Sequence, residues 1–546
     1  MGGQCMTKFD LAAHRRKLRD LGHWTDEHYD DFLRKALQDH PDKLAVVADR
    51  SSGVVRLSFR ELEDRIARAA GGLRKLGVGK GDVVALQMPN WWEFVVAVLA
   101  AQRLGAITNP LMPIFREREL RFMLGFARCK VFIVPEGFGT LDLVGTARLL
   151  RDELDHLEHV VVAHGTGSDS FDALLNSGER VDLAPEGTPP VTDPGEPSML
   201  MYTSGTTGSP KGVQHTVNSM VNAARSMTRR GHLSNDDVLL VGSPVGHMLG
   251  LAAGVLLAIF NRATMVLQES WNGRHALDLI NEYKVTFSGG ATPFLADLVR
   301  EVQAGAPSPE SLRLFLCAGA PIPPVLVRQA GEVLGTTVTS VWGMTESLAS
   351  TMTEPERAGQ LSSISDGRPV AGMEVKVVDD AGKTLAAGKP GRLLVRGAQL
   401  HVGYMGIPPE QTFDAEGWMD TGDLAYCLAE DDCSGYIRIA GRTKDVIIRG
   451  GENIPVVEIE NLLLEHPAIT GAALVGYPDE RLGERACAFL TAKDGATVSL
   501  DDLRLWMDEK RVAKQYWPER IEIIEAMPRT PSGKIQKFLL RDMLNP

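Results

Sequence analysis

Helical and strand-like patterns alternate through most of this 546-residue chain. Residues 59–76 show the helical spacing of apolar side chains, and a short apolar run at 83–86 follows as a buried strand. Residues 94–104 return to a helical pattern, and the runs at 131–134 and 159–163 again indicate strands. Such alternation predicts an α/β fold with largely parallel sheets. A chain of this length is too long for one core, so we expect two or more domains.

The pattern changes after about residue 371, where alternating strands at 373–378 and 391–397 are separated by turns containing glycine and proline. This change indicates an antiparallel β subdomain. The last block has the size of a small independent domain. We therefore expect an N-terminal domain over residues 1–442, with the β subdomain at about 371–442, and a C-terminal α+β domain over residues 443–546.

Composition narrows the classes of function. The formal net charge of -12 argues against nucleic acid as a partner, because a phosphate backbone attracts basic surfaces. The six cysteines are scattered and form no Cys-x-x-Cys pair, which fits a reducing compartment. No apolar run has membrane-spanning length, and the first residues lack the apolar stretch of a signal peptide. We expect a cytoplasmic protein without stable membrane insertion.

A segment dense in glycine, hydroxyl groups and one lysine follows the apolar run at 199–201 and precedes a helical pattern from about residue 218. Its sequence is Thr203-Ser204-Gly205-Thr206-Thr207-Gly208-Ser209-Pro210-Lys211-Gly212. Glycines let backbone N–H groups approach an anion, hydroxyls donate hydrogen bonds, and the lysine adds positive charge. We predict a strand–loop–helix phosphate site. The segment is not a Walker loop, since Lys211 follows a proline, and the alternative is a plain surface loop.

Further clusters lie far apart in the sequence but in a fixed order. They are Trp342-Gly343-Met344-Thr345-Glu346, Thr421-Gly422-Asp423, Gly441-Arg442-Thr443-Lys444, Gly450-Gly451 and Arg529-Thr530-Pro531-Ser532-Gly533-Lys534. Together with the phosphate segment, this set resembles the adenylate-forming superfamily of acyl-CoA synthetases, carrier-loading adenylation domains and luciferases. The resemblance covers nearly the whole chain, from Leu57-Ser58-Phe59 to Lys534.

The resemblance implies a two-step reaction that uses ATP, Mg²⁺ and coenzyme A. A carboxylate is a poor electrophile, so it first attacks the α-phosphate of ATP to give an acyl adenylate and pyrophosphate. A thiol then displaces AMP, which is a good leaving group. Both steps build or move negative charge, so the protein needs hydrogen-bond donors and cations in fixed positions.

Site residues follow from the resemblance, position by position. The residues expected to bind the β- and γ-phosphates are Thr203, Ser204, Gly205, Thr206, Thr207, Gly208 and Lys211. Glu346 corresponds to the Mg²⁺ ligand, and its neighbour Thr345 to the residue that contacts the α-phosphate. The residues expected around adenine and ribose are Gly319, Ala320, Pro321, Trp342, Gly343, Met344, Asp423 and Arg442. The alternative for Glu346 is a charge at a helix start.

The C-terminal region supplies the mobile part of the expected mechanism. Lys534 resembles the lysine that bridges the carboxylate and the α-phosphate in the first step; its alternative is a solvated terminal lysine. Lys444 occupies the hinge position about which the final domain rotates between the two steps. Gly450 and Gly451 correspond to the tunnel for the pantetheine arm of coenzyme A. Lys510, Arg511 and Lys514 could hold its phosphates, although a solvated helix face is favoured.

The acyl pocket is expected from His247, Met248, Gly289, Gly290 and Gly343. His247 is interpreted as a gate, with a structural histidine equally favoured. Relatives that use acetate or propionate carry tryptophan at the position of Gly343, so the glycine predicts a larger acid. Met248 follows the gate where dihydroxybenzoate-activating relatives carry asparagine, which argues against that substrate.

The overall pattern most resembles medium-chain fatty acyl-CoA and cyclohexanecarboxylate-CoA ligases. We expect an apolar, medium-chain or alicyclic acid with coenzyme A as acceptor. One alternative is an adenylating enzyme that loads a carrier-protein phosphopantetheine. Another is a catalytically silent binder of nucleotide or acid. The sequence leaves a homodimer open.

Overall fold

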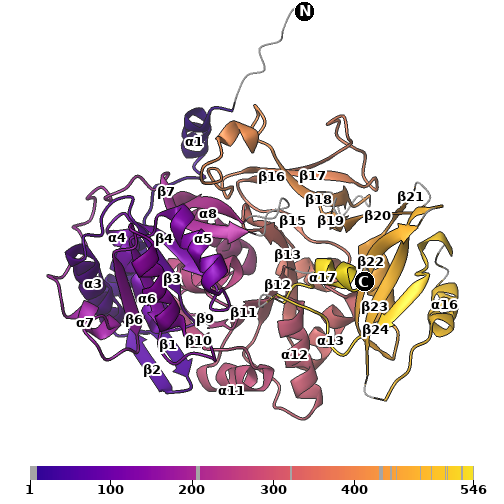
Figure 1. Ribbon diagram of the computed structural model, residues 1–546, viewed down its shortest axis with the longest axis horizontal. Coiled ribbons are helices and arrows are strands. Elements are labelled where there is room, and N and C mark those ends of the chain that lie inside the picture. The colour runs from indigo at the N-terminus through magenta and orange to yellow at the C-terminus, as the bar shows by residue number, and fades with distance from the viewer. Residues whose placement is uncertain are drawn as a thin grey trace, which may run out of the picture.

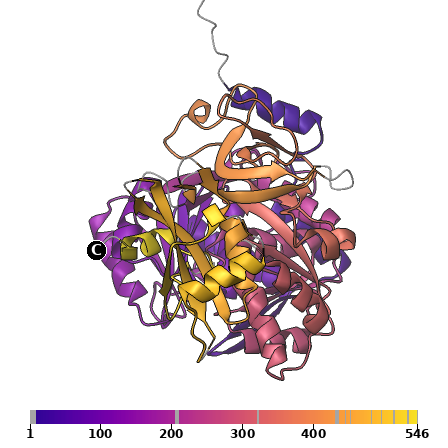
Figure 2. The same ribbon diagram turned by 90° about the vertical axis from the view of Figure 1, so that its right-hand side faces the viewer.

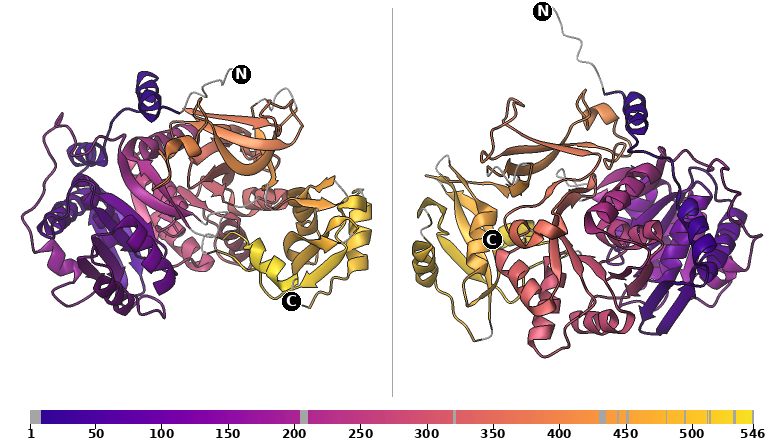
Figure 3. Two further views of the ribbon diagram at one scale, coloured as in Figure 1. Left: turned by 45° about the horizontal axis from the view of Figure 1, so that its top comes forward. Right: turned by 180° about the vertical axis from the view of Figure 1, so that it is seen from behind.

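The computed structural model describes residues 9–203, 210–319, 322–429, 435–442, 445–449, 452–479, 481–493, 495–510, 512, 514–530 and 533–544. Arg442, Ile448, Glu452, Asn453 and Gln515 are described by their backbone alone. Within these residues the chain forms four sheets with helices packed around them (Figure 1). The six-stranded sheet and the C-terminal sheet lie on opposite sides of the molecule (Figure 3).

A nine-stranded sheet forms the centre of the molecule. Its order is β15 (Arg368–Pro369), β14 (Leu348–Met352), β13 (Thr337–Met344), β12 (Leu314–Ala318), β11 (Phe287–Gly290), β9 (Val238–Val241), β10 (Thr264–Gln268), β1 (Leu44–Arg50) and β2 (Gly53–Ser58). The strands from β13 through β1 run parallel, and antiparallel strands close both edges. Their buried side chains meet helices on each face, as expected for parallel sheets.

A second sheet repeats this design. Its order is β6 (His159–Ala163), β5 (Val131–Pro135), β3 (Val83–Gln87), β4 (Ile107–Leu111), β7 (Pro197–Thr203) and β8 (Lys211–Thr216). All neighbours are parallel except β7 and β8, which form an antiparallel hairpin. The predicted α/β class with largely parallel sheets is therefore confirmed.

The helices cover these two sheets. In the first half of the chain they are α2 (Tyr29–Asp39), α3 (Phe59–Lys75), α4 (Trp92–Arg103), α5 (Glu117–Ala127), α6 (Leu143–Glu153), α7 (Phe171–Leu175), α8 (Val217–Gly231), α9 (Met248–Gly250), the π-helix η1 (Leu251–Leu256) and α10 (Leu257–Asn261). They continue with α11 (Gly273–Tyr283), α12 (Thr292–Gln303), α13 (Pro324–Leu334) and α14 (Pro355–Leu361). Ser58 and Glu61 form a capping box that starts α3. Among the described residues, no helix is long and apolar enough to cross a membrane.

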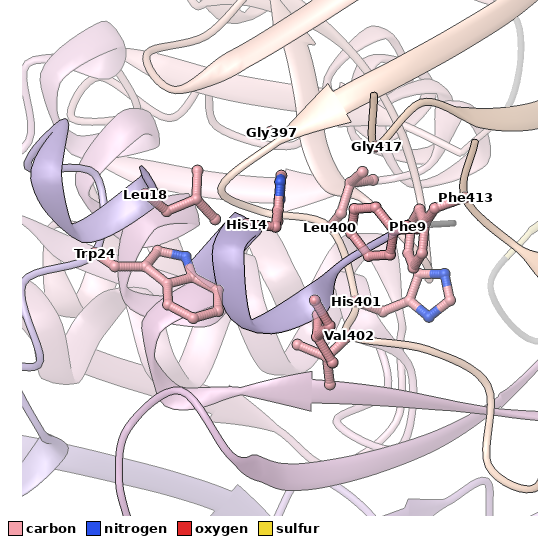
Figure 4. A pocket seen from close by; sticks show the side chains of 11 residues that line it. Phe9, His14, Leu18, Trp24, Gly397, Leu400, His401, Val402, Phe413 and Gly417 are labelled. Atoms are coloured by element: carbon pink, nitrogen blue, oxygen red, sulfur yellow. The ribbon is translucent and has the colours of Figure 1, made fainter. Parts of the chain in front are cut away.

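The β subdomain is a four-stranded antiparallel sheet. It contains β16 (Met373–Val378), β17 (Gly391–Gly397), β18 (Met419–Cys427) and β19 (Ile437–Arg442), with the 3-10 turn η2 (Pro409–Gln411) in a connection. The N-terminal helix α1 (Leu11–Asp20) lies against it (Figure 4). Trp24 donates its indole N–H to the Ala398 carbonyl at 2.9 Å, which fixes this contact.

The C-terminal sheet combines β21 (Glu452–Ile454), β20 (Ile447–Arg449), β23 (Gly483–Ala492) and β22 (Ile469–Asp479), with β24 (Arg520–Ile523) parallel to β23. Its helices are α15 (Val456–Leu464), α16 (Leu500–Glu509), the 3-10 turn η5 (Lys514–Tyr516) and α17 (Lys537–Leu544). It has a core of its own, and Figure 2 shows it in front of the larger body. A segment before α17 extends from it toward β11 and β12 (Figure 1).

Candidate active site

The phosphate segment lies inside a hairpin. Thr203 ends β7 and pairs with Lys211 at the start of β8, and α8 begins only at Val217. The predicted strand–loop–helix arrangement is therefore wrong: a strand separates the loop from the helix, so the helix N-terminus does not follow the loop directly. The predicted residues Ser204, Gly205, Thr206, Thr207 and Gly208 lie outside the described residues.

β8 connects several parts of the site. Gly212 accepts a backbone hydrogen bond from Met405 at 2.7 Å, and Val213 forms a bridge with Tyr404. On the same strand, a ring nitrogen of His215 lies 2.6 Å from the Thr345 carbonyl oxygen. Burial lowers the pKa of His215 to about 4, so the ring is neutral at pH 7 and donates to that carbonyl. The strand thus holds the turn that carries Thr345 and Glu346.

Glu346 is buried, 6% exposed, and faces the end of β7. The Thr203 hydroxyl lies 3.4 Å from its Oε1, and the Tyr404 hydroxyl donates to the same oxygen at 2.9 Å. Lys211 places its ammonium 4.9 Å from the centre of the Tyr404 ring. The structure therefore brings together three residues predicted from two distant motifs. Tyr404, which links Glu346 to Lys211, was missed, because a lone Gly-Tyr pair carries no specific signal.

The donor set around Glu346 consists of oxygen atoms. Mg²⁺ prefers such ligands, and it typically keeps several waters while binding one or two carboxylates beside nucleotide phosphates. The buried carboxylate of Glu346, with the Thr203 hydroxyl nearby, fits this coordination preference. Among the described residues, no cluster of three or more His, Cys, Asp or Glu side chains offers a metal site made of protein ligands alone.

Trp342, Asp423 and Arg442, which were predicted around adenine and ribose, lie next to one another. The Trp342 indole N–H donates to Asp423 Oδ2 at 3.0 Å, and both side chains are buried. Arg442 pairs with Asp423 across β18 and β19 in the backbone register. Gly319 directly follows β12 with a positive φ of 82°, which favours glycine. Ala320 and Pro321 lie outside the described residues.

Lys534 is carried into the same region by the C-terminal segment. An ideal Cβ at Gly533 would lie 3.2 Å from Pro293 and 3.3 Å from Ala291, so this backbone contacts the start of α12. Burial and then the positive charge of Lys534 lower the pKa of His247 to about 4. His247 is therefore neutral, and its Nδ1 accepts from the Leu249 N–H at 3.2 Å as the cap of α9. The segment that bears Lys534 thus lies near enough to the loop that bears His247 for its charge to act on that ring.

The expected acyl-pocket residues differ in where they face. An ideal Cβ at Gly289 would make only ordinary contacts, at 3.8 Å to Leu316 and 4.0 Å to Ala253. At Gly290 it would lie 2.9 Å from Phe294, so this glycine serves the packing of α12. Met248 is buried and leads into η1. Such π segments are rare and frequently accompany functional sites.

Gly343 requires a correction. An ideal Cβ there would lie 1.6 Å from the Leu348 carbonyl oxygen, because β13 and β14 approach closely at a register shift. The hairpin packing explains the missing side chain. Gly343 therefore does not support the prediction that a glycine here opens the pocket to an acid larger than propionate.

The remaining predicted positions bear on the second step. Lys444, Gly450 and Gly451 lie outside the described residues, as does Arg511. Lys510 donates to Glu465 at 2.6 Å and its ammonium lies 4.7 Å from the Trp506 ring centre. Lys514 lies over the Trp517 ring. Both lysines thus have partners on the C-terminal domain, as the favoured interpretation of a solvated helix face allows.

Comparison with known proteins places this geometry in a family. Residues 33–405 match the AMP-binding enzyme family, and residues 458–534 match the AMP-binding enzyme C-terminal domain. The chain is 36% identical over 535 residues to the medium-chain fatty-acid–CoA ligase of Escherichia coli (strain K12), covering 96% of this chain and 92% of that protein. It is 34% identical over 544 residues to the salicyl-AMP ligase / salicyl-S-ArCP synthetase of Mycobacterium tuberculosis (strain ATCC 25618 / H37Rv), covering 98% and 94%.

A solved structure agrees with these relatives. The anthranilate CoA ligase AuaEII in complex with anthranoyl-AMP superposes with a TM-score of 0.84 at 27% identity, over 96% of this chain and 98% of that one. The predicted fold, a large domain of parallel sheets with a smaller C-terminal domain, is thereby confirmed. The chain belongs to the AMP-binding, adenylate-forming enzyme family, as an AMP-forming acid–thiol ligase of the acyl-CoA synthetase type.

Proposed function

We propose that this enzyme activates an apolar medium-chain or alicyclic carboxylic acid as its acyl adenylate and transfers the acyl group to coenzyme A. One observation carries the proposal: Thr203, Lys211 and Glu346 meet at one site, and the segment bearing Lys534 reaches the adjoining loop of His247. The Thr203 hydroxyl and the ammonium groups of Lys211 and Lys534 would supply the donors and cations for the negative charge that develops there.

The first half-reaction assigns each group a task. Lys534 would place its ammonium between the carboxylate and the α-phosphate, and Thr345 would contact that phosphate. Lys211 and Thr203 would hold the outer phosphates together with the loop between them. Asp423 would accept the ribose hydroxyls while Trp342 packs on adenine. Glu346, near the Thr203 hydroxyl, would hold Mg²⁺, which neutralises phosphate charge when bound.

The second half-reaction requires a rearrangement. We propose that residues 443–546 rotate as a domain about Lys444, so that the segment bearing Lys534 leaves the site and Gly450 and Gly451 line the path of the pantetheine arm. Such hinges need only a few residues that absorb large dihedral changes. The boundary after residue 442 coincides with the end of β19.

The side chains around the expected acyl pocket support the choice of an apolar acid. Gly289, Ala253 and Leu316 are small or apolar, and the neutral His247 adds no charge. The E. coli relative is named for medium-chain fatty acids, which agrees with an apolar acid. Adenylate formation needs no charged group in such a pocket, because the apolar tail contributes binding through its burial.

A second candidate is an adenylating enzyme for an aryl acid that loads a carrier protein. The M. tuberculosis relative, named as a salicyl-AMP ligase and salicyl-S-ArCP synthetase, favours it at 34% identity. The tests differ in acid and acceptor. Acid-dependent exchange of labelled pyrophosphate into ATP should be measured with hexanoate, octanoate, cyclohexanecarboxylate, benzoate and salicylate, and AMP release with free coenzyme A against holo-carrier proteins.

We expect the strongest exchange with octanoate or cyclohexanecarboxylate, and faster AMP release with coenzyme A than with any carrier. Preference for salicylate together with a holo-carrier would replace our proposal by the second candidate. Absence of exchange with every acid would indicate a silent binder and reject both.

A further inference from the structure

The residues before α17 form a tight hairpin that carries Lys534. Thr530 donates its backbone N–H to the Lys534 carbonyl at 2.8 Å, and Gly533 donates to the Thr530 carbonyl at 2.8 Å. The backbone of Arg529 forms an antiparallel β-bridge with Ile535, and the Arg529 side chain donates a hydrogen bond from Nη1 to the Gly533 carbonyl at 2.8 Å. The lysine is thus attached to a braced loop, and its position depends on where that loop is seated.

The seat is the first turn of α12. Gly533 packs so closely on Ala291 and Pro293 that an added Cβ would be within 3.3 Å of both. Asp297 lies four residues after Pro293 on the same helix, and residues at this spacing share a face. Asp297 therefore lies on the same side of α12 as Pro293, on which the hairpin packs. Its negative charge acts on Arg529, opposing the effect of desolvation on the pKa of that guanidinium.

Asp297 is held in place by groups on the large domain. The Trp271 indole N–H donates to its Oδ2 at 2.8 Å, and Arg300 pairs with its Oδ1 at 2.8 Å. The Trp271 ring packs in turn on Phe294, with ring centres 4.5 Å apart. The Asp297 side chain is 26% exposed, whereas Arg300 is 65% exposed. The carboxylate is therefore held by side chains of the large domain.

We propose that Asp297 is a positioning residue, which receives the Arg529 side of the hairpin and so seats Lys534 in the site during adenylate formation. The inference rests on the proposed function, in which Lys534 serves only the first half-reaction. Neither Asp297 nor Arg529 is assigned a contact with substrate. Their attraction would favour the adenylating arrangement of the C-terminal domain and would be lost when the hairpin departs.

The first test is Asp297→Asn, which keeps an oxygen for the Trp271 N–H but removes the charge. Since Arg529 is exposed, its attraction to Asp297 is screened, and we expect an effect of about three- to fivefold, the upper range for an exposed pair. Hydrogen exchange of residues 528–536 and of the first turn of α12 should accelerate by about that factor. Pyrophosphate exchange with octanoate should fall likewise, while thioester formation from supplied octanoyl adenylate should not fall.

Two controls separate a positioning role from general damage. Asp278→Asn makes the same change on α11, where the carboxylate pairs with Arg274 at 3.5 Å, and should leave both readouts at wild-type values. Arg529→Gln should reproduce the effect of Asp297→Asn, and the double variant should lose no more than either single variant. Higher salt should also diminish the difference between wild type and Asp297→Asn.

The outcomes distinguish this inference from the proposed function. Unchanged hydrogen exchange in Asp297→Asn, multiplicative losses in the double variant, or equal losses in both half-reactions would overturn the positioning role. If the wild-type enzyme exchanged pyrophosphate with no acid of the panel, the proposed function would fail. The hydrogen-exchange comparison would then still decide whether Asp297 seats the hairpin.

Discussion

At the scale of single residues, the site depends on groups that serve two partners at once. The Tyr404 hydroxyl donates to Glu346 at 2.9 Å while the face of its ring lies beneath the Lys211 ammonium. Burial and the neighbouring Glu346 carboxylate raise the pKa of Tyr404, so the phenol remains a donor throughout the range in which enzymes work. This one side chain holds both a proposed metal ligand and a proposed phosphate-binding cation before ATP enters.

Tyr404→Phe tests this role, because it keeps the ring under Lys211 and removes only the hydroxyl. Hydrogen bonds to charged groups contribute about 1.5–3 kcal/mol. We expect pyrophosphate exchange to slow by about tenfold or more, with a higher Mg²⁺ concentration needed for half-maximal rate. The measurement is a Mg²⁺ titration at saturating ATP. A variant with an unchanged Mg²⁺ requirement would show that Tyr404 does not organise Glu346.

The two adjacent glycines at the end of β11 give a second test at this scale. Successive residues of a strand face opposite sides, and here Gly289 faces Ala253 and Leu316 while Gly290 faces Phe294. Gly289→Leu should therefore fill the acyl pocket. We expect the rate with octanoate to fall by at least about tenfold relative to the rate with butanoate, because the longer acid loses the burial of several methylene groups. A panel of straight-chain acids measures the profile.

Gly290→Ala is the matched control for that change. Its Cβ would meet Phe294 at 2.9 Å, so we expect lower stability from overpacking and an unchanged chain-length profile. A shift of the profile in this control, or none in Gly289→Leu, would reject the assignment of the pocket wall.

At the scale of elements, β8 organises the site. Its residues contact the Tyr404 segment, the Thr345 turn and, through Lys211, the end of β7. The sequence pattern did not reveal this strand, because its buried positions include His215 and Thr216 in place of an apolar alternation. The strands at 159–163, 373–378 and 391–397 were predicted with correct bounds, since their apolar or alternating patterns dominate. Polar residues that satisfy one another inside the fold cannot be recognised from periodicity alone.

The same limit applies to the site. The family resemblance implied that Thr203, Glu346 and Lys211 belong to one site, and their proximity agrees with that expectation. The resemblance could not predict the contact of Trp342 with Asp423, because it depends on how two separate sheets pack. Nor could it predict the close approach of Leu348 to Gly343, because this depends on the register between β13 and β14. Residue identity at a motif position therefore indicates chemistry more readily than it indicates shape.

The stability of the contact between α1 and the β subdomain should depend on pH. His14 lies beside Phe9, with ring centres 5.3 Å apart, in the contact shown in Figure 4. Burial, followed by the positive charges of Lys17 and Arg396, lowers the pKa of His14 to about 4. In the detached helix the ring would titrate near its ordinary value of about 6.5. The undocked state therefore binds the extra proton between these values, and docking is fully stable above about pH 6.5.

As the pH falls from about 6.5 toward 4, that contribution is lost, up to roughly 1–3 kcal/mol. We expect limited proteolysis within residues 9–20 to be faster at pH 4.5 than at pH 7, when it is measured with a protease that is active at both pH values. His14→Gln should remove most of this pH dependence. Equal cleavage of the wild type at both pH values would contradict the neutral, docked histidine.

At the scale of the whole molecule, two bodies contribute groups to the site. The large domain holds Glu346, Lys211 and Asp423, while Lys534 is supplied by the domain with its own core. In this arrangement the charge of Lys534 lowers the pKa of His247, which agrees with the place that we propose for the lysine in the first half-reaction. If the C-terminal domain rotates, one enzyme performs two reactions at one site without moving the bound acyl group.

Lys534→Ala tests that division of labour. Loss of an electrostatic contact made in the transition state costs about a hundred- to thousandfold in rate, so pyrophosphate exchange should fall by that factor. Thioester formation from supplied octanoyl adenylate should stay within about threefold, because the lysine would be absent from the site in that step. Lys537→Ala is the matched control on the same segment, since its ammonium lies 2.7 Å from Glu460. Equal losses in both half-reactions would contradict domain rotation, because a fixed lysine would then serve both steps.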